Sequence, residues 1–209
     1  VLDSPILTNS QLKKFKRFFS KKTKEIDCTF DISSSLKDRI EEIREEAETS
    51  VREGSTCLIL SDKNISNKKA SIPSILTVGA VHSHLVKLGL RGYCSLNVEC
   101  ADALDTHSFA ILIGVGATTV NPYLAIDSIY QRYEKELFGK SNFESCVVKF
   151  KKSIDAGLLK IMSKMGISVI SSYRGGCNFE AVGLSRAIVS DYFPGMSSRI
   201  SGIGVIGIE

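Results

Sequence analysis

The sequence predicts an α/β fold with a mostly parallel sheet and alternating helices. Short apolar runs alternate along the chain with longer segments in which apolar residues recur at helical spacing. One of the short runs, 56–60, is apolar at nearly every position, which is typical of a strand covered on both faces of a sheet. Strands that alternate with helices in this way form parallel sheets with right-handed crossovers.

The expected elements begin with a strand over 26–32. Ser35 then caps a helix, with Asp38 as its reciprocal partner, and Gly54 ends that helix. After the strand at 56–60 and a polar loop over 61–71, Pro73 opens an apolar helix. The later elements are strands at 93–100, 117–120 and 167–172, and helices that start near 105, 122, 142 and 185. A partial or irregular (βα) barrel and an open doubly wound sheet both fit this order.

Length and composition indicate one domain over residues 1–209, because 209 residues with 43% hydrophobic content can bury a real core. The net charge of +4 does not by itself indicate a nucleic-acid partner. No apolar run is long enough to span a membrane. The six cysteines form no CxxC pair, so we expect a reducing, cytoplasmic setting. Both ends look cut, which suggests a piece of a longer polypeptide.

The N-terminal segment 1–25 is basic, with the run 13-KKFKRFFSKKTK-24. We interpret it as a solvated helix face, with Leu12, Phe15, Phe18 and Phe19 turned inward. The alternative is contact with a phosphate backbone, which the modest charge of the remaining chain disfavours.

Two loops are candidates for function. Ser61, Asp62, Lys63 and Asn64 follow the buried strand at 56–60, at the carboxyl edge where parallel sheets bind ligands. Asp62 could accept a proton or pair with a cation, or it could make a structural loop bond.

The second loop is expected between a strand and a helix, and it contains Tyr173, Arg174, Gly175, Gly176 and Cys177. Backbone N–H groups and Arg174 could hold an anion, or the Cys177 thiol could act as a nucleophile. The alternative is a tight glycine turn with an inert cysteine.

Metal and dinucleotide sites are not indicated. His82 and His84 are two residues apart on a helix and face different ways, so we expect one buried and one surface histidine. Cys94 and Cys100 flank a strand and lie about 20 Å apart if it is regular. The GxG of 113-IGVGATTVNPY-123 follows a helix, the reverse of a dinucleotide fingerprint, and we interpret its glycines as helix termination and close packing.

Several stretches carry a specific resemblance to one family. They are 3-DSPILT-8, 58-LILSDKNIS-66, 72-IPSILTVGAVHSHL-85, 112-LIGVGATTVNPYLA-125, 157-GLLKIMSKMGISVISSYRGGCNFEAVGL-184 and 194-PGMSSRISGIG-204. In this order they resemble the central domain of the large (alpha) subunit of glutamate synthase.

The resemblance implies a domain between an N-terminal glutamine amidotransferase domain and an FMN-binding barrel, with 173–209 at the junction with the latter. In the family, ammonia from glutamine passes through a tunnel and joins 2-oxoglutarate at the flavin. The flavin is reduced through a 3Fe-4S cluster with electrons from NAD(P)H or ferredoxin, in some cases by way of a small reductase subunit. The family's catalytic, cofactor and metal residues match no position here, so the implied role is linkage and tunnel formation.

The two candidate loops are therefore expected to face neighbouring domains or the ammonia path. Two alternatives stay open: an independent small α/β enzyme that uses Cys177 or Asp62, and a nucleic-acid binder that uses the basic segment. No membrane partner is expected.

Overall fold

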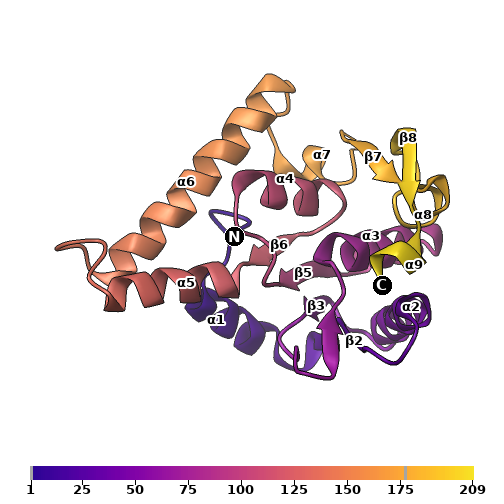
Figure 1. Cartoon of the computed structure of the whole chain (residues 1–209), viewed down its shortest axis with the longest axis horizontal. Coiled ribbons are helices and arrows are strands. Elements are labelled where there is room, and N and C mark those ends of the chain that lie inside the picture. Colours follow the sequence, from indigo (N-terminus) through magenta and orange to yellow (C-terminus); the bar gives the residue numbers. More distant parts are fainter. Residues whose placement is uncertain (1, 177) are drawn as a thin grey trace.

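A computed structural model describes residues 2–176 and 178–209. Its centre is a four-stranded parallel sheet (Figure 1). Within this sheet, the strands lie side by side in the order in which they follow one another along the chain, and β2 (Thr29–Asp31) and β4 (Lys69–Ser71) form a separate pair. The order in the four-stranded sheet is β1-β3-β5-β6, with bounds β1 (Thr23–Asp27), β3 (Cys57–Ser61), β5 (Ser95–Glu99) and β6 (Thr119–Asn121). The mostly parallel sheet with alternating helices is confirmed.

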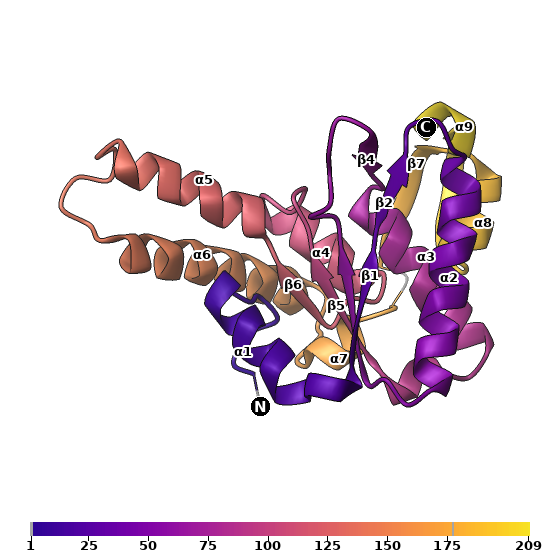
Figure 2. The same cartoon turned by 90° about the horizontal axis from the view of Figure 1, so that it is seen from below.

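The connecting helices cover one face of this sheet. They are α2 (Leu36–Arg52), α3 (Ser74–Lys87) and α4 (Thr106–Gly114). Helix α1 (Asn9–Phe19) covers the opposite face (Figure 2). Parallel strands in chain order with all connecting helices on one side form part of a (βα) barrel, whereas a doubly wound sheet reverses its order and carries crossover helices on both faces. The topology is therefore that of a partial barrel.

Successive side chains of a strand point to opposite faces of the sheet, so the buried side chains form two clusters, one on each face. Leu58, Leu60 and Val98 point outward and pack with α2, α3 and α4 in the main core. Cys57 and Ile59 point inward, into a smaller cluster completed by Leu7, Leu12, Phe15 and Phe19. Full burial of a large aliphatic side chain such as Leu58 or Ile59 contributes about 1.5–3 kcal/mol to folding.

Local sequence signals set most helix ends as expected, but the contacts of the described residues do not include the reciprocal bond predicted from the Asp38 side chain to Ser35. The Ser35 hydroxyl accepts a hydrogen bond from the Asp38 N–H at 3.3 Å, and Asp105 and Asn142 cap α4 and α6 (Phe143–Lys164) in the same way. Gly54 follows α2 with φ +97°, a conformation that glycine adopts without a steric penalty. Gly116, after α4, has φ +132° and lies so close to His82 that an added Cβ would overlap the imidazole ring.

Two long helices form a hairpin that projects from the body of the molecule (Figures 1 and 2). They are α5 (Tyr123–Glu134) and α6 (Phe143–Lys164). The inner part of α6 returns to the core through Ile154, Leu158 and Met162, while the far end of the hairpin is exposed.

The C-terminal part differs from the prediction. The expected strand over 167–172 is wrong: α7 (Ile170–Tyr173) lies there instead. A fifth strand would need the free edge of β6, but the N-terminal segment occupies that edge. The Leu7 N–H donates to the Val120 carbonyl at 2.9 Å, and the Val120 N–H donates to the Pro5 carbonyl at 2.8 Å.

The remaining elements were only partly expected. Helix α8 (Arg186–Tyr192) confirms the predicted helix near 185. The predicted strand over 26–32 is two strands, and the second pairs antiparallel with part of the segment expected to be loop. The additional elements are β2 (Thr29–Asp31), β4 (Lys69–Ser71), the parallel pair β7 (Glu180–Leu184) and β8 (Ser197–Ile203), α9 (Val205–Ile208), and the 3₁₀ turns η1 (Ser20–Lys22) and η2 (Arg91–Tyr93).

The basic segment is mostly helix α1, and its interpretation needs one correction. Leu12 is buried, and Phe15 and Phe19 pack against the inner cluster, as expected. Phe18 is 82% exposed and does not turn inward. Among the helices of the described residues, none is long and apolar enough to cross a bilayer.

Candidate functional site

The two candidate loops lie at opposite ends of the sheet. Ser61 ends β3, and in the strand register it stands between Asp27 and Glu99 at the carboxyl edge. The turn at 173–176 lies at the amino edge, where the Gly175 N–H donates to the carbonyl of Gly114 at 2.7 Å, just ahead of β6. This turn follows a short helix and precedes a strand, so its expected place after a strand and before a helix is wrong. The structure does not bring the loops together into one site.

At the carboxyl edge, the centre of the polar contacts is Glu99, which sequence reasoning missed. Its side chain is 4% exposed and accepts bonds from the Nζ of Lys63 at 2.6 Å and the Nζ of Lys16 at 3.2 Å. The Ser61 hydroxyl donates to it at 3.1 Å. Burial by itself would raise the pKa of Glu99, but the two ammonium groups outweigh burial and hold the pKa below its usual value. Glu99 is therefore an ionised carboxylate that joins α1, β3 and β5.

Asp62 is also buried, and its contacts are those of a structural loop residue. Its Oδ2 accepts the Ala101 N–H at 3.0 Å and the Ser71 hydroxyl at 3.3 Å. The pKa of Asp62 is raised, chiefly because burial disfavours the charged form. Lys63 extends away from Asp62, toward Glu99 and over the ring of Tyr123 at 5.0 Å. Asn64 is exposed and interacts with Asp27.

The carboxyl edge does not suit a flavin phosphate. Asp27, Asp62, Glu99 and Asp102 all lie there, and the phosphate's negative charge would meet theirs. The nearby ammonium groups of Lys16 and Lys63 are held by Glu99. Within the described part of the chain, no group of three or more His, Cys, Asp or Glu side chains is placed to hold a metal ion. The negative charge of these carboxylates therefore argues against a flavin phosphate at this edge.

At the amino edge, the turn at 173–176 packs against α3 and α4. Tyr173 is 1% exposed and its ring meets Phe179 edge-on. Arg174 is half-buried, and its Nε has no hydrogen-bond partner among the described residues. Gly175 has φ +69°, and Gly176 is exposed. Cys177, the candidate nucleophile, lies outside the described residues.

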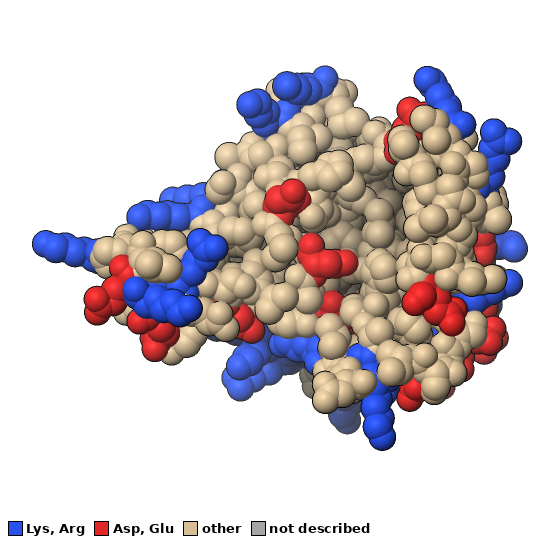
Figure 3. Space-filling view, viewed as in Figure 1, with Lys and Arg blue, Asp and Glu red and all other residues tan. Residues whose placement is uncertain are grey.

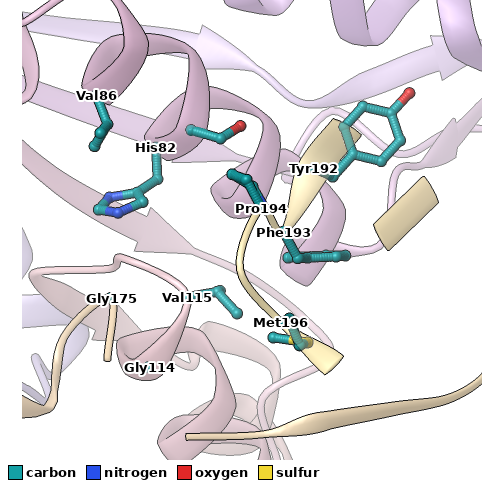
Figure 4. Close-up of a pocket in the computed structure, with 10 residues that line it drawn as sticks. His82, Val86, Gly114, Val115, Gly175, Tyr192, Phe193, Pro194 and Met196 are labelled. Carbon is teal, nitrogen blue, oxygen red and sulfur yellow. The ribbon is translucent and has the colours of Figure 1, made fainter. Parts of the chain in front are cut away.

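A cavity of about 170 Å³ opens beside this turn (Figure 4). His82 projects into it from α3, facing Gly114 and Gly175, and Val115, Phe193 and Met196 form its apolar walls.

His82 is held by Arg91, whose Nε donates to the His82 Nδ1 at 3.1 Å. Burial, together with the charges of Arg91 and Arg174, lowers the pKa of His82 to about 4, so the imidazole is neutral near pH 7. His84 instead pairs with Glu48 at 2.9 Å. Both histidines are partly exposed, so the prediction of one buried and one surface histidine is wrong, although the two rings do have different partners.

Comparison with known proteins identifies the relatives of this chain. The sequence model of the glutamate synthase central domain matches residues 1–185. The glutamate synthase [NADPH] large chain of Azospirillum brasilense is 53% identical over 211 residues, covering 100% of this chain. The corresponding large chain of Bacillus subtilis is 41% identical over 97% of this chain. The chain spans only 14% and 13% of the length of these two relatives.

Among solved structures, the chain is similar to a dihydroorotate dehydrogenase (DHODH) from Eimeria tenella in complex with ferulenol. The TM-score is 0.50 at 14% identity, and the match covers 75% of this chain and 38% of the other. At this identity the likeness concerns the fold alone.

Proposed function

This chain belongs to the glutamate synthase central domain family, and we propose that it serves as the central domain of a glutamate synthase large chain. The observation that carries the proposal is the match of the family model over residues 1–185, together with 53% identity to the Azospirillum brasilense large chain along the whole sequence. The whole protein would make L-glutamate from glutamine and 2-oxoglutarate by ammonia channelling and reductive amination. FMN, a 3Fe-4S cluster and the electron donor would bind to parts outside these residues.

Within that enzyme we assign this domain a linking role between the amidotransferase and FMN domains. Exposed residues at both ends of the sheet support the assignment, because a linker needs a contact surface toward each neighbour. They are Lys63 and Asn64 at one end and Gly175 and Gly176 at the other. Ser61–Asn64 would serve one end and Tyr173–Cys177 the other, and either could border the ammonia path.

The surface also supports a role in contact with other domains. Figure 3 shows that Lys and Arg gather around the rim of one face and are sparse across its middle. Several apolar side chains of the C-terminal segment are exposed: Val182 at 64%, Ile200 at 61% and Ile206 at 90%. Exposed apolar groups gathered in one segment are typical of protein contact sites. An independent enzyme built on Asp62 has less support, because that carboxylate already accepts bonds from the Ala101 N–H and the Ser71 hydroxyl.

The test is a domain exchange in the full-length synthase. Residues 1–209 are replaced by the aligned segment of the Azospirillum brasilense large chain, and the control replaces them with an unrelated α/β domain of equal length. We expect the first chimera to keep glutamine-dependent glutamate formation within about tenfold and the control to lose it. Equal loss in both chimeras, with both polypeptides folded, would contradict the proposal. Before the domain exchange, an immunoblot would measure the size of the native polypeptide. A band near 22.8 kDa, the mass of this chain alone, would contradict the proposed function.

A further inference from the structure

A groove of about 890 Å³ lies along the hairpin of α5 and α6 and is bounded on one side by the start of α1 (Figure 2). Its floor is mainly apolar, and Ile126 and Val147 are buried in it. Two further lining side chains stay open to solvent: Tyr130 is 48% exposed and Val148 is 49% exposed. The Tyr130 ring meets Phe143 edge-on at 5.3 Å. Aromatic and aliphatic groups that remain half-exposed in one groove are typical of protein contact sites.

The rim of this groove carries both signs of charge. Asp127 of α5 and Glu144 of α6 line it, and so do Lys151 and Lys152 of α6. No ion pair among the described residues uses any of these four side chains. Figure 3 shows both signs of charge along the projecting hairpin. A segment with charges of one sign would meet a like charge on this rim, so an occupant that fits must carry both signs.

The order of charges along α6 is complementary to itself. Glu144, Val148 and Lys152 follow one another at intervals of four residues, so they form one row on the same side of the helix. Each charged residue lies about 6 Å along the helix axis from Val148. When two copies of α6 lie antiparallel and cross at Val148, Glu144 of each copy lies opposite Lys152 of the other. A parallel crossing would instead place like charges together.

We propose that two copies of this chain pair through their hairpins, with α6 antiparallel to α6 about a two-fold axis at Val148. Such a contact uses the same patch on both copies and closes as a dimer. Tyr130 and Val148 supply its apolar centre, and two Glu144–Lys152 pairs set its register. Because the hairpin projects from the body of the molecule, a second hairpin can reach this face (Figures 1 and 2).

The test is sedimentation velocity of the chain at protein concentrations up to about 1 mM, where a weak dimer is still detected. We expect an equilibrium of monomer and dimer that added salt shifts toward the monomer. Glu144→Lys or Lys152→Glu alone should weaken the dimer at least about tenfold, because two attractive pairs become two repulsive ones. The control, Glu45→Lys, changes an exposed glutamate of α2 outside the groove and should leave the dimer unchanged.

An equimolar mixture of the Glu144→Lys and Lys152→Glu variants should dimerise again, because both contacts then join opposite charges. A wild-type chain that stays monomeric at every concentration would overturn the proposal. So would a mixture that stays monomeric although circular dichroism shows both variants folded. Lys152→Gln replaces a variant that fails to fold, and an unchanged dimer in it would contradict the proposed pairs. None of these measurements uses glutamate synthase activity, so their failure leaves the proposed function untouched.

Discussion

At the scale of single residues, buried charge at the carboxyl edge is balanced by specific partners. Glu99 has two lysines and a serine, whereas Asp62 is bonded by one backbone N–H and a serine. The pKa of Glu99 is lowered and that of Asp62 is raised, although both side chains are buried. The ammonium groups make this difference, because they stabilise the ionised form of Glu99 more than burial destabilises it.

Replacing Glu99 by Gln should therefore destabilise the chain at neutral pH. The variant leaves Lys16 and Lys63 without their charged partner, and we expect a loss of about 2 kcal/mol in the free energy of unfolding. Urea unfolding followed by circular dichroism measures it. The folded pKa of Glu99 lies below its unfolded value, so its contribution is present above about pH 4.3 and is lost as the pH falls through the folded pKa. The difference between wild type and variant should shrink over that range.

Glu42→Gln is the matched control for this substitution. Glu42 also accepts a bond from a cation, Arg39 at 2.8 Å, but its side chain is 63% exposed. Exposed pairs contribute little, so we expect a change within about 0.5 kcal/mol. Equal effects of the two substitutions would show that the burial of Glu99 is unimportant.

The sequence indicated this edge only in part. The loop after β3 was predicted as polar and at the carboxyl edge, because a buried apolar strand precedes it. The sequence did not indicate Glu99, because this residue falls at the end of an expected strand. The alternation of apolar and polar residues does not by itself distinguish a buried acidic side chain from an exposed one there. Only the register of β3 with β5, and the fold of α1 over both, bring its two lysines to it.

At the scale of elements, α1 replaces the missing half of the barrel as a cover for the inner face. Leu12 is its buried side chain and meets Cys57 and Ile59 of β3. The apolar spacing of α1 predicted this inward face. Phe18 lies on the same helix but points to solvent. A basic helix can therefore cover a sheet: Lys13 and Lys14 remain exposed, while Lys16 reaches Glu99.

Leu12→Ala should cost about 3 kcal/mol of stability, because it removes buried methyl groups and leaves a void at the sheet. Phe18→Ala removes a larger side chain from the same helix and should cost less than about 1 kcal/mol. Urea denaturation of both variants checks the difference. A larger loss for Phe18→Ala would mean that the outer face of α1 is covered by something other than solvent.

Elements with strong end signals were predicted well, and those that depend on pairing partners were not. Ser35, Asp105 and Asn142 mark helix starts through local bonds that the sequence already specifies. Whether the apolar run at 167–172 becomes a strand depends on a free sheet edge, and residues near Ile6 occupy that edge. Among the described strands, β7 and β8 form a separate pair, each contains one glycine (Gly183 and Gly202), and their sequences show little alternation.

At the scale of the whole molecule, a compact half-barrel carries a long projecting hairpin. The sheet and its outer helices share one core, in which Ile40, Ile43 and Ala47 of α2 are fully buried. The far end of the hairpin lacks such contacts: Tyr130 is 48% exposed and Leu137 is 65% exposed. The stability of the hairpin must then come mainly from pairing of α5 with α6.

Hydrogen exchange should separate these two parts. We expect the helical amides over 130–134 and 143–148 to exchange at least tenfold faster than those of α2, because local opening of the hairpin exposes little apolar surface. Mass spectrometry of the exchanged chain measures both regions in one sample, so α2 serves as the internal reference. Exchange as slow as that of α2 at low protein concentration would show that the hairpin is stabilised within the chain itself. Slowing only at high concentration would instead point to association through its exposed apolar side chains.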